Sequence, residues 1–436
     1  MIRPLCFLKD EYVRAYSGLP RRAWILFAVN LVNSSGAMVF FFLSLYLTRE
    51  IGLTTARAGQ ALSVYGFGSL AGAFAGGWLA DRIGSIRVQK MSLAVCGVLL
   101  IALGQARTMA GILPLLFAMA LFAGTLYPAN ATSMAKVCPP ELQIKGFALN
   151  RLANNLGATI GPAVGGALAV HSYGLLFWAD GLTSLAAAGV FAMLWKGGRA
   201  GRDARNDASR VLDANASGAL GAVSLGGEAD RVPDGPVLSA ATAPAPAAKP
   251  RSPWRDVPFL AMMGIFLVWS IVFVQVLSTF PIYVRNVYGL AENRIGQLFA
   301  VNTILIVLLE MVLMERIRRY PLTRMINLSF VLLGIGLGLM PLGRGFAFGA
   351  LTVAVWTFGE MLSMPLVTAL ISERADDSNR GRYMGLNSLS FSLAFIVGPP
   401  IGTAIYDGLG PDAVWYVCAA TCALIAVAFS ALRRHL

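Results

Sequence analysis

Residues 52–60 read GLTTARAGQ and residues 289–297 read GLAENRIGQ, so a pattern of Gly, Leu, Arg, Gly and Gln recurs 237 residues later. The same offset holds along most of the chain without a gap. It aligns Tyr46 with Tyr283, Pro128 with Pro365, and Gly161-Pro162 with Gly398-Pro399. Two copies that run in the same direction predict two similar halves, related by an axis along the membrane normal.

The composition is that of an integral membrane protein. Of the 436 residues, 57% are hydrophobic and only 13% are charged, and the mean hydropathy is +0.67. Apolar runs of about 20 residues are long enough to cross the hydrocarbon core as helices. We predict twelve spans, at residues 23–47, 58–79, 87–106, 111–135, 146–170, 174–195, 258–284, 294–314, 325–342, 345–371, 382–406 and 411–432. Six spans per half is an even number, so both halves keep the same orientation.

The predicted fold is therefore an all-α membrane fold of two pseudo-symmetric six-helix bundles. The first bundle takes residues 1–195 and the second takes residues 258–436. Between them, residues 196–257 are rich in Gly, Ala, Pro, Ser, Asp and Arg and show no helical or strand periodicity. This composition predicts a flexible cytoplasmic linker.

The net charge of +13 would suit a nucleic-acid-binding protein, but its placement indicates a membrane topology instead. With the N-terminus inside, only six of the 35 Lys and Arg residues fall on outer loops: Arg49, Arg57, Arg107, Arg285, Arg294 and Arg344. This is the positive-inside pattern. We expect a monomeric, multi-pass protein of a bacterial inner membrane, with both termini in the cytoplasm and no nucleic-acid partner.

Enzymatic chemistry has no support in the sequence. The five cysteines are scattered without metal-ligand spacing, and the two histidines, His171 and His435, lie at a helix end and near the C-terminus. The sequence shows no Ser/His/Asp set or phosphate-binding loop. We therefore predict a protein that is not an enzyme and that holds no metal and no cofactor.

A glycine-rich loop follows the second predicted span. Residues 77–84 read GWLADRIG, and basic residues come shortly after. Glycines let a helix approach its neighbour and then turn, while an Asp can hold a cation or a helix N-terminus. The residues that we assign to this conformational motif are Gly77, Asp81, Arg82, Gly84 and Arg87. The stretch resembles the signature loop of the major facilitator superfamily, although Ser85-Ile86 stands where that family usually has basic residues.

The fifth span carries a second motif, G-x-x-x-G-P-x-x-G-G. Its residues are Gly157, Gly161, Pro162, Gly165 and Gly166, and the other copy repeats part of it as Gly398-Pro399. Small residues make a smooth contact surface, and the proline bends the helix. The string resembles the motif of proton-coupled drug antiporters in the superfamily, which implies export. The Arg that this branch often has in its fourth helix is absent, and Arg151 lies in the fifth span instead.

The repeat also separates scaffold from candidate function, because residues shared by both copies belong to the common scaffold. Four charged residues within spans have uncharged counterparts. Glu360 aligns with Ala123, Glu310 with Ala73, Asp180 with Val417, and Arg151 with Ser388. A charge at mid-membrane costs about 2.5 to 3.5 kcal/mol, so such residues face a cavity or a partner. We predict Glu360, Glu310 and Asp180 as proton-coupling candidates, although each could instead have a structural role.

The resemblance implies that helices one, four, seven and ten line a central cavity. The candidate substrate-contacting residues are Arg151, Asn30, Asn33, Ser34, Tyr127, Asn130, Trp269, Gln275, Ser278 and Trp356. With Phe40, Phe41 and Phe42 nearby, such a site would suit a partly apolar organic solute. For each aromatic residue, packing or lipid contact is the alternative.

The sequence thus predicts a secondary carrier that exports a small amphipathic compound in exchange for protons by alternating access. Two alternatives stay open. The same scaffold could serve uptake, as a symporter or facilitator of a metabolite, because motifs constrain direction poorly. A receptor that binds a solute without moving it is the other alternative.

Overall fold

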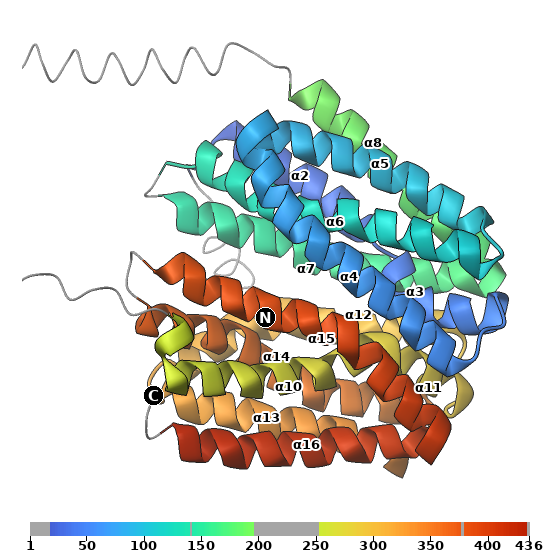
Figure 1. The fold of residues 1–436 in the computed structure, drawn as a ribbon, viewed down its shortest axis with the longest axis vertical. Helices are drawn as coiled ribbons and strands as arrows, with labels where there is room; N and C mark the ends of the chain where they lie inside the picture. The colour runs from blue at the N-terminus through green and yellow to red at the C-terminus, as the bar shows by residue number, and fades with distance from the viewer. Residues whose placement is uncertain (1–17, 140–141, 196–252, 376–378, 434–436) are drawn as a thin grey trace, which may run out of the picture. The chain divides into compact units, whose positions relative to one another are not determined.

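The computed structural model describes residues 18–139, 142–195, 253–375 and 379–433, and these residues form helices joined by short turns (Figure 1). Among these residues, 18–192 and 253–433 belong to one compact unit. Most of the predicted linker therefore lies outside the described residues.

The first bundle has six spans. In chain order its elements are α2 (Arg21–Gly36), α3 (Val39–Leu45) with a π-helical turn (Tyr46–Glu50), α4 (Thr55–Leu79), α5 (Ser85–Gln105), α6 (Met109–Val137), α7 (Gln143–His171) and α8 (Tyr173–Leu194). The observed helices agree with the predicted spans to within a few residues. We call the helix ends nearest residues 195 and 253 the linker end, and the opposite ends the far end.

The second bundle repeats the arrangement. Its elements are α10 (Val257–Ser278), α11 (Phe280–Asn286), α12 (Glu292–Ile317), α13 (Leu322–Gly338) with a short 3-10 turn (Met340–Leu342), α14 (Gly345–Arg374), α15 (Arg380–Leu409) and α16 (Pro411–Leu432). The predicted all-α fold with twelve membrane helices is confirmed.

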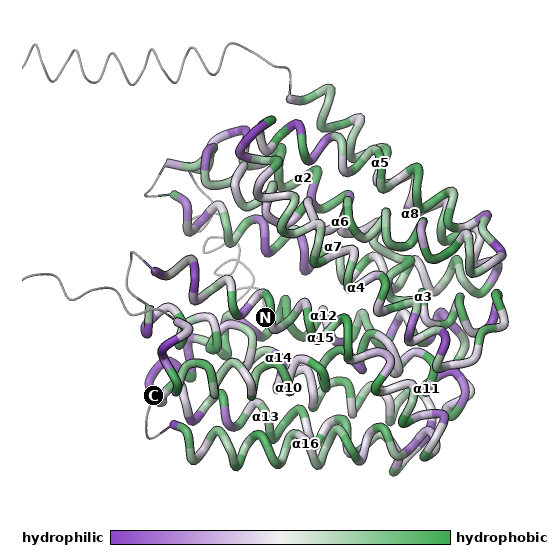
Figure 2. Tube along the Cα trace, in the orientation of Figure 1, coloured by the Kyte–Doolittle hydropathy of each residue, from purple (hydrophilic) through white to green (hydrophobic). Residues whose placement is uncertain are grey.

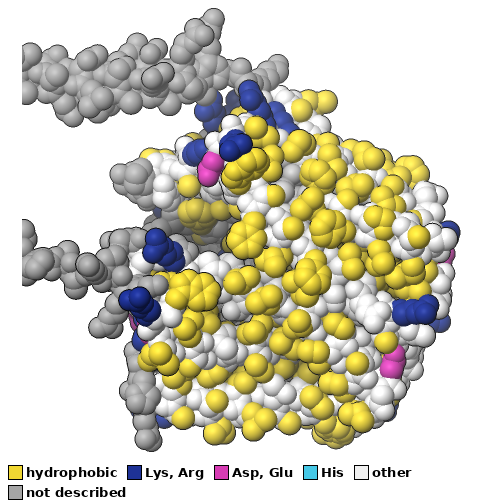
Figure 3. Space-filling view, viewed as in Figure 1, with side chains coloured by type: hydrophobic (Ala, Val, Ile, Leu, Met, Phe, Trp, Pro, Cys, Tyr) yellow, Lys and Arg dark blue, Asp and Glu magenta, His cyan; other side chains and the backbone are white. Residues whose placement is uncertain are grey.

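Length and hydropathy mark ten stretches of the described chain as able to cross a membrane, and the stretch Thr55–Gln105 contains both α4 and α5. The short helix α11 lies outside these stretches, and so does α7, which is long enough to span but carries Asn150, Arg151 and Asn154. The middle parts of the helices are mostly hydrophobic, and hydrophilic residues gather toward the helix ends (Figure 2). Apolar side chains spread across the outer face that Figure 3 shows, while Lys and Arg lie near its edges. Such a band is what lipid requires.

The first and seventh spans are broken, whereas the sequence predicts each as one helix. In the first span, α2 ends at Gly36 and α3 begins at Val39. In the seventh, the break falls at Thr279, between α10 and α11. Pro281 explains the second break, since proline has no N–H to donate to the preceding turn. The first break is stabilised by a side chain of the sixth span, which is described below.

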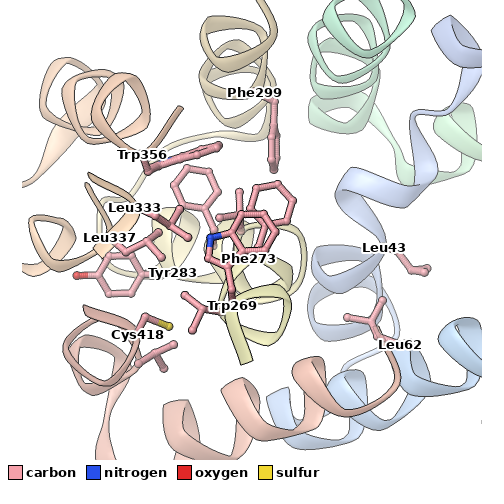
Figure 4. Packing of buried hydrophobic residues seen from close by; sticks show 14 of the residues in the cluster. Leu43, Leu62, Trp269, Phe273, Tyr283, Phe299, Leu333, Leu337, Trp356 and Cys418 are labelled. Atoms are coloured by element: carbon pink, nitrogen blue, oxygen red, sulfur yellow. The ribbon is translucent and has the colours of Figure 1, made fainter. Parts of the chain in front are cut away.

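An aromatic core fills the second bundle. Trp269 stacks on Phe273 with ring centroids 5.3 Å apart and an interplanar angle of 12°. Both rings lie near Phe299 and Trp356, while Leu43 and Leu62 of the first bundle lie on the other side of the view (Figure 4). Trp356 is only 1% exposed. The described part of this core therefore depends mainly on apolar packing.

The two bundles meet along two seams, α4 against α15 and α7 against α12. Glycines allow the close approach: a Cβ on Gly66 would lie 2.8 Å from the Phe395 backbone, and one on Gly166 would lie 3.1 Å from the Asn293 backbone. At the linker end, a Cβ on Gly77 or Gly385 would meet nothing within 4 Å. The backbones of the two bundles are thus in close contact toward the far end.

Candidate functional site

Glu360 lies within α14, beside polar residues of the same bundle. The side chain of Asn302, on α12, donates to Glu360 Oε2 at 2.8 Å and to Thr357 Oγ1 at 2.9 Å. Asn302 is 7% exposed and Thr357 is fully buried. One amide thus holds the carboxyl group of Glu360 against α12.

Two other predicted charges lie near this group. Arg151, on α7 of the first bundle, forms an ion pair with Glu310 on α12 of the second. Glu310 is 11% exposed at its side chain and Arg151 is 53% exposed. Glu310 lies on the same helix as Asn302, the hydrogen-bond partner of Glu360. One helix, α12, therefore connects Glu360 of α14 with Arg151 across the α7–α12 seam.

A cavity of about 230 Å³ lies toward the linker end of the first bundle, between α2, α5, α6 and α7. Five predicted substrate-contacting residues line it: Asn30, Asn33, Ser34, Tyr127 and Asn130. The other lining residues are Val29, Gln89, Leu93, Ala123, Leu126, Asn150 and Asn154. The cavity wall therefore combines amides with aliphatic side chains.

The amides of this wall form a hydrogen-bonded network. Asn30 Nδ2 donates to Asn150 Oδ1 at 2.9 Å and to Asn154 Oδ1 at 2.8 Å. Asn130 Nδ2 also donates to Asn150 Oδ1, at 2.9 Å, and Ser34 Oγ donates to Asn154 Oδ1 at 3.1 Å. In these bonds Asn30 and Asn130 use their amide nitrogens, while Asn150 and Asn154 use their amide oxygens.

Asp180, the third predicted carboxyl candidate, lies elsewhere. Its Oδ2 accepts a hydrogen bond at 3.0 Å from the backbone N–H of Val39, the first residue of α3. Asp180 is 5% exposed. A carboxylate at a helix N-terminus satisfies a free donor and complements the helix dipole. Asp180 therefore stabilises the break in the first span.

The remaining cavity candidates take part in packing. Gln275 Nε2 donates to the carbonyl of Gly398 at 2.8 Å, and its Oε1 accepts from Thr279 at 2.8 Å and from Ser278 at 3.3 Å. These bonds join α10 to α15. Trp269 and Trp356 lie in the aromatic core described above. None of the four lines the cavity between α2, α5, α6 and α7.

The two glycine motifs have distinct positions. Gly84 has a φ of +91°, a conformation that favours glycine, and it ends the π-helical turn (Ala80–Gly84) between α4 and α5. Next to it, the Arg82 guanidinium stacks 4.1 Å over the Trp78 ring. Within the described residues, no hydrogen bond or ion pair involves the exposed Asp81. The same holds for the exposed side chain of Arg87, so a latch role for this loop stays a prediction.

The motif of α7 makes contacts on two sides. Gly161 approaches the Ser35 carbonyl, and a Cβ on Gly165 would lie 2.8 Å from Met38 Cβ. Gly157 packs on Ser34, while Gly166 and Pro162 contact α12 of the second bundle. In α15, Gly398 and Pro399 contact Gln275 and Gly59 respectively. Each copy of the motif therefore packs both within its own bundle and across a seam.

Sequence reasoning missed several residues of the site. Asn150 aligns with Asn387, so the repeat assigned it to the scaffold, yet it joins three helices of the cavity wall. Asn302, Asn154 and Gln89 also escaped, because they lie outside helices one, four, seven and ten, which were the ones searched for cavity residues. Thr357 lies on the tenth helix and was not selected. Membrane-buried amides on any helix would have been the useful signal.

The chemistry of this arrangement suits transport. A carboxyl group in an apolar environment, next to a single amide donor, can take up and release a proton. The helix of its amide donor, α12, also carries Glu310, whose ion pair with Arg151 reaches the other bundle. Together with a polar cavity inside a membrane domain, these features define a solute carrier.

Comparison with known proteins agrees with this class. The family model described as Major Facilitator Superfamily matches residues 25–378 and, in a second match, 358–435. The chain belongs to this superfamily. It is a multi-pass membrane transporter with a small-molecule substrate, and the family and the relatives below are transporters rather than enzymes.

Three relatives cover nearly the whole chain. The uncharacterized MFS-type transporter YttB of Bacillus subtilis is 23% identical over 90% of both chains. A Na(+), Li(+), K(+)/H(+) antiporter of Planococcus maritimus is 24% identical over 84% of this chain and 85% of its own. The multidrug resistance protein MdtH of Edwardsiella ictaluri is 24% identical over 88% and 86%.

Solved structures share the fold. A POT family transporter, crystallised with a thioalcohol-conjugated peptide, superposes with a TM-score of 0.75 at 15% identity, over 96% of this chain and 97% of its own. A second POT family structure, with 5-aminolevulinic acid, gives 0.72 at 16% identity over 94% and 96%. At this identity the likeness concerns the fold alone.

Proposed function

We propose that this protein exports a small amphipathic organic compound from a bacterial cytoplasm in exchange for protons. The observation that carries the proposal is a carboxyl group, Glu360, held by Asn302 of α12, the helix whose Glu310 forms an ion pair with the other bundle. Asn302 donates to Oε2, so the proton is carried on Oε1. Protonation removes the negative charge of Glu360 and changes the field that acts on Arg151 and Glu310.

The proposed cycle is alternating access between two rigid halves, residues 1–195 and 258–436, joined by the linker 196–257. The linker end faces the cytoplasm of a bacterial inner membrane, with both termini on that side. Close backbone contact at the far end and a cavity toward the linker end fit a conformation that loads solute from the cytoplasm. The protein works as a monomer, and Asp81 latches the linker end in the opposite state.

Names of relatives support export and proton exchange. The Edwardsiella protein is a multidrug resistance protein, and the Planococcus protein is an antiporter of alkali cations and protons. The direction of transport belongs to the proposal. If an inward-directed proton gradient drives accumulation of the compound inside vesicles, and reversal of the gradient abolishes that accumulation, the protein would instead be an uptake carrier.

The test uses proteoliposomes that contain a pH-sensitive dye and carry an imposed pH gradient. Addition of a transported drug-like compound releases protons through the unmodified protein. We expect Glu360→Gln to reduce this exchange at least tenfold, because an amide cannot carry the proton. The matched control is Glu373→Gln, an exposed residue of the same helix, which should keep full exchange. Full proton-driven exchange by Glu360→Gln would contradict the role of Glu360.

A second candidate function is exchange of alkali cations for protons, as the name of the Planococcus relative suggests. The same proteoliposomes test it when sodium, lithium or potassium chloride is added in place of an organic compound. Proton release by a salt, dependent on Glu360, would favour this second function. Proton release only by organic compounds would favour the first.

A further inference from the structure

We infer that the cavity between α2, α5, α6 and α7 binds an uncharged hydrogen-bonding group of the transported compound, a carboxamide or a hydroxyl. The inference rests on the proposed transport function and names the polar end of its substrate. The argument depends on the charge of the cavity wall and on hydrogen-bonding atoms that the wall leaves unused.

The cavity wall has no ionised side chain among its twelve lining residues. Its polar members are Asn30, Asn33, Ser34, Gln89, Tyr127, Asn130, Asn150 and Asn154. An ionised group buried there would lose its hydration without gaining a counter-charge, which is strongly unfavourable. The wall therefore selects against carboxylate and ammonium groups.

One wall atom requires a donor from outside the network. Asn130 is 9% exposed and lines the cavity, and its Oδ1 is buried without a hydrogen-bond partner among the described residues. Its amide nitrogen donates to Asn150 Oδ1. A buried acceptor without a partner costs free energy, and a rotation of the side chain that turns Oδ1 into the cavity would let a ligand N–H or O–H recover it.

The same wall also offers donors. Asn150 and Asn154 use their Oδ1 atoms to accept from Asn30, and within the described residues no acceptor for either Nδ2 is present. A carboxamide or hydroxyl can donate to Asn130 and accept from Asn150 or Asn154 at once. A carboxylate can only accept and an ammonium can only donate, so neither completes the wall.

The apolar side chains of the cavity wall indicate that the rest of the ligand is apolar. Val29, Leu93, Ala123 and Leu126 line it beside the amides. These side chains would cover an aliphatic or aromatic body. The predicted ligand is thus an apolar body with a neutral polar head.

The experiment compares three probes with one apolar body and different heads: 1-naphthaleneacetamide, 1-naphthaleneacetate and 1-naphthylmethylammonium. Binding to the purified full-length protein in detergent is measured by equilibrium dialysis, and the melting temperature is measured in parallel. We expect the amide to bind at least about tenfold more tightly than either charged probe, since it alone satisfies both donor and acceptor.

Variants localise the binding. Asn130→Leu should weaken amide binding about tenfold, because the acceptor is removed. Asn130→Ser, which keeps a small polar group, guards against a folding defect and should bind with intermediate affinity. The matched control is Asn327→Leu on α13, because Asn327 Oδ1 is also buried without a partner but lies outside this cavity. That control should bind the amide as the unmodified protein does.

Other outcomes separate this inference from the transport function. Tighter binding of a charged probe, or unchanged amide binding in both Asn130 variants, would overturn the inference while proton exchange could still stand. Amide binding that survives in a protein without Glu360-dependent proton exchange would support the inference and overturn the transport proposal. Absence of binding by all three probes would overturn the inference.

Discussion

At the residue scale, Asp180 shows that a buried carboxyl group in a membrane helix can serve the backbone. The repeat selected Asp180 by the same criterion as Glu360, since both have apolar counterparts. The structure places Asp180 at the start of α3, where the break after Gly36 leaves the Val39 N–H without a partner in its own helix. A helix end inside a membrane needs such an acceptor, because no water is present to supply one.

We expect Asp180→Leu to lower the free energy of unfolding by about 1–3 kcal/mol, because the buried Val39 N–H would lose its acceptor. Asp180→Asn keeps a side-chain oxygen and should cost less. Thermal unfolding in detergent measures both. An Asp180→Asn protein that melts normally but has lost proton-driven exchange would instead give Asp180 a coupling role.

Charged residues within apolar spans are easier to notice in the sequence than buried amides are. Glu360, Glu310 and Arg151 stand out because a charge within an apolar span is costly wherever it lacks a function or a partner. Asn150 and Asn302 do not stand out, because an amide costs less to bury and is as common in packing as in binding. Their roles depend on neighbours from other helices, which one sequence does not display.

At the scale of single elements, helix existence was predictable and helix continuity was not. Apolar runs of sufficient length define the spans, and the boundaries of α6 and α16 illustrate the agreement. At the break between α2 and α3, the start of α3 is capped by Asp180, which is distant in sequence. Only the break before Pro281 had a local signal, and the prediction of a continuous span 258–284 overlooked it.

The linker end of α10 is anchored by charge. Asp256 caps the helix by accepting from the Phe259 N–H at 3.2 Å. Its carboxylate also accepts two hydrogen bonds of 2.7 Å from Arg374, on α14, and one of 3.2 Å from the Tyr383 hydroxyl, on α15. Three helices of the second bundle thus meet at one carboxylate. The hydrogen bond from Arg374 is the main cause of a lowered pKa for Asp256.

A carboxyl whose pKa is lowered by folding stabilises the folded state above its unfolded pKa of 3.8 and loses that contribution as pH falls through the folded value. We therefore expect Asp256→Asn to destabilise the protein by about 2 kcal/mol at neutral pH. The difference from the unmodified protein should shrink below about pH 4. Thermal unfolding at pH 7 and pH 3 measures it.

The control for this prediction is Asp81→Asn, because Asp81 is exposed and makes no hydrogen bond or ion pair with the described residues. Its effect on stability should be small at both pH values. A difference between Asp256→Asn and the unmodified protein that stayed constant from pH 7 to pH 3 would show that charge is not the cause.

At the scale of the whole molecule, the sequence repeat accounts for the two similar bundles, and the contacts along the two seams hold the bundles together at the far end. The α4–α15 seam includes the Ala56 N–H, which donates to Asp407 at 2.9 Å. On the other seam, the Tyr173 hydroxyl donates to Glu292 at 3.0 Å. Both bonds cross between the bundles at the far end. Alternating access requires both seams to separate there.

A covalent link across one seam should therefore stop transport. A Cβ on Gly59 would lie 3.1 Å from Thr403 Cβ, close to the separation of about 3.8 Å in a disulfide. We expect the Gly59→Cys, Thr403→Cys double variant to form a disulfide under mild oxidation and to lose transport at least tenfold. A reductant should restore it.

The Thr403→Cys single variant provides the control, since oxidation should leave its transport unchanged. Cross-linking is followed by the mobility of the oxidised protein after cleavage between residues 195 and 253. Undiminished transport by fully cross-linked protein would show that the far end of this seam does not open during the cycle.

The glycine seams have a consequence for the speed of the cycle. Where Gly66 lies on the Phe395 backbone and Gly296 on Pro162, the touching surfaces are main chain. Long interlocking side chains must adopt new rotamers each time a contact forms, and each ordered side chain costs entropy. Smooth backbone surfaces avoid most of that cost. Such seams can therefore come together and separate with a low kinetic barrier, as the repeated turnover of a carrier demands.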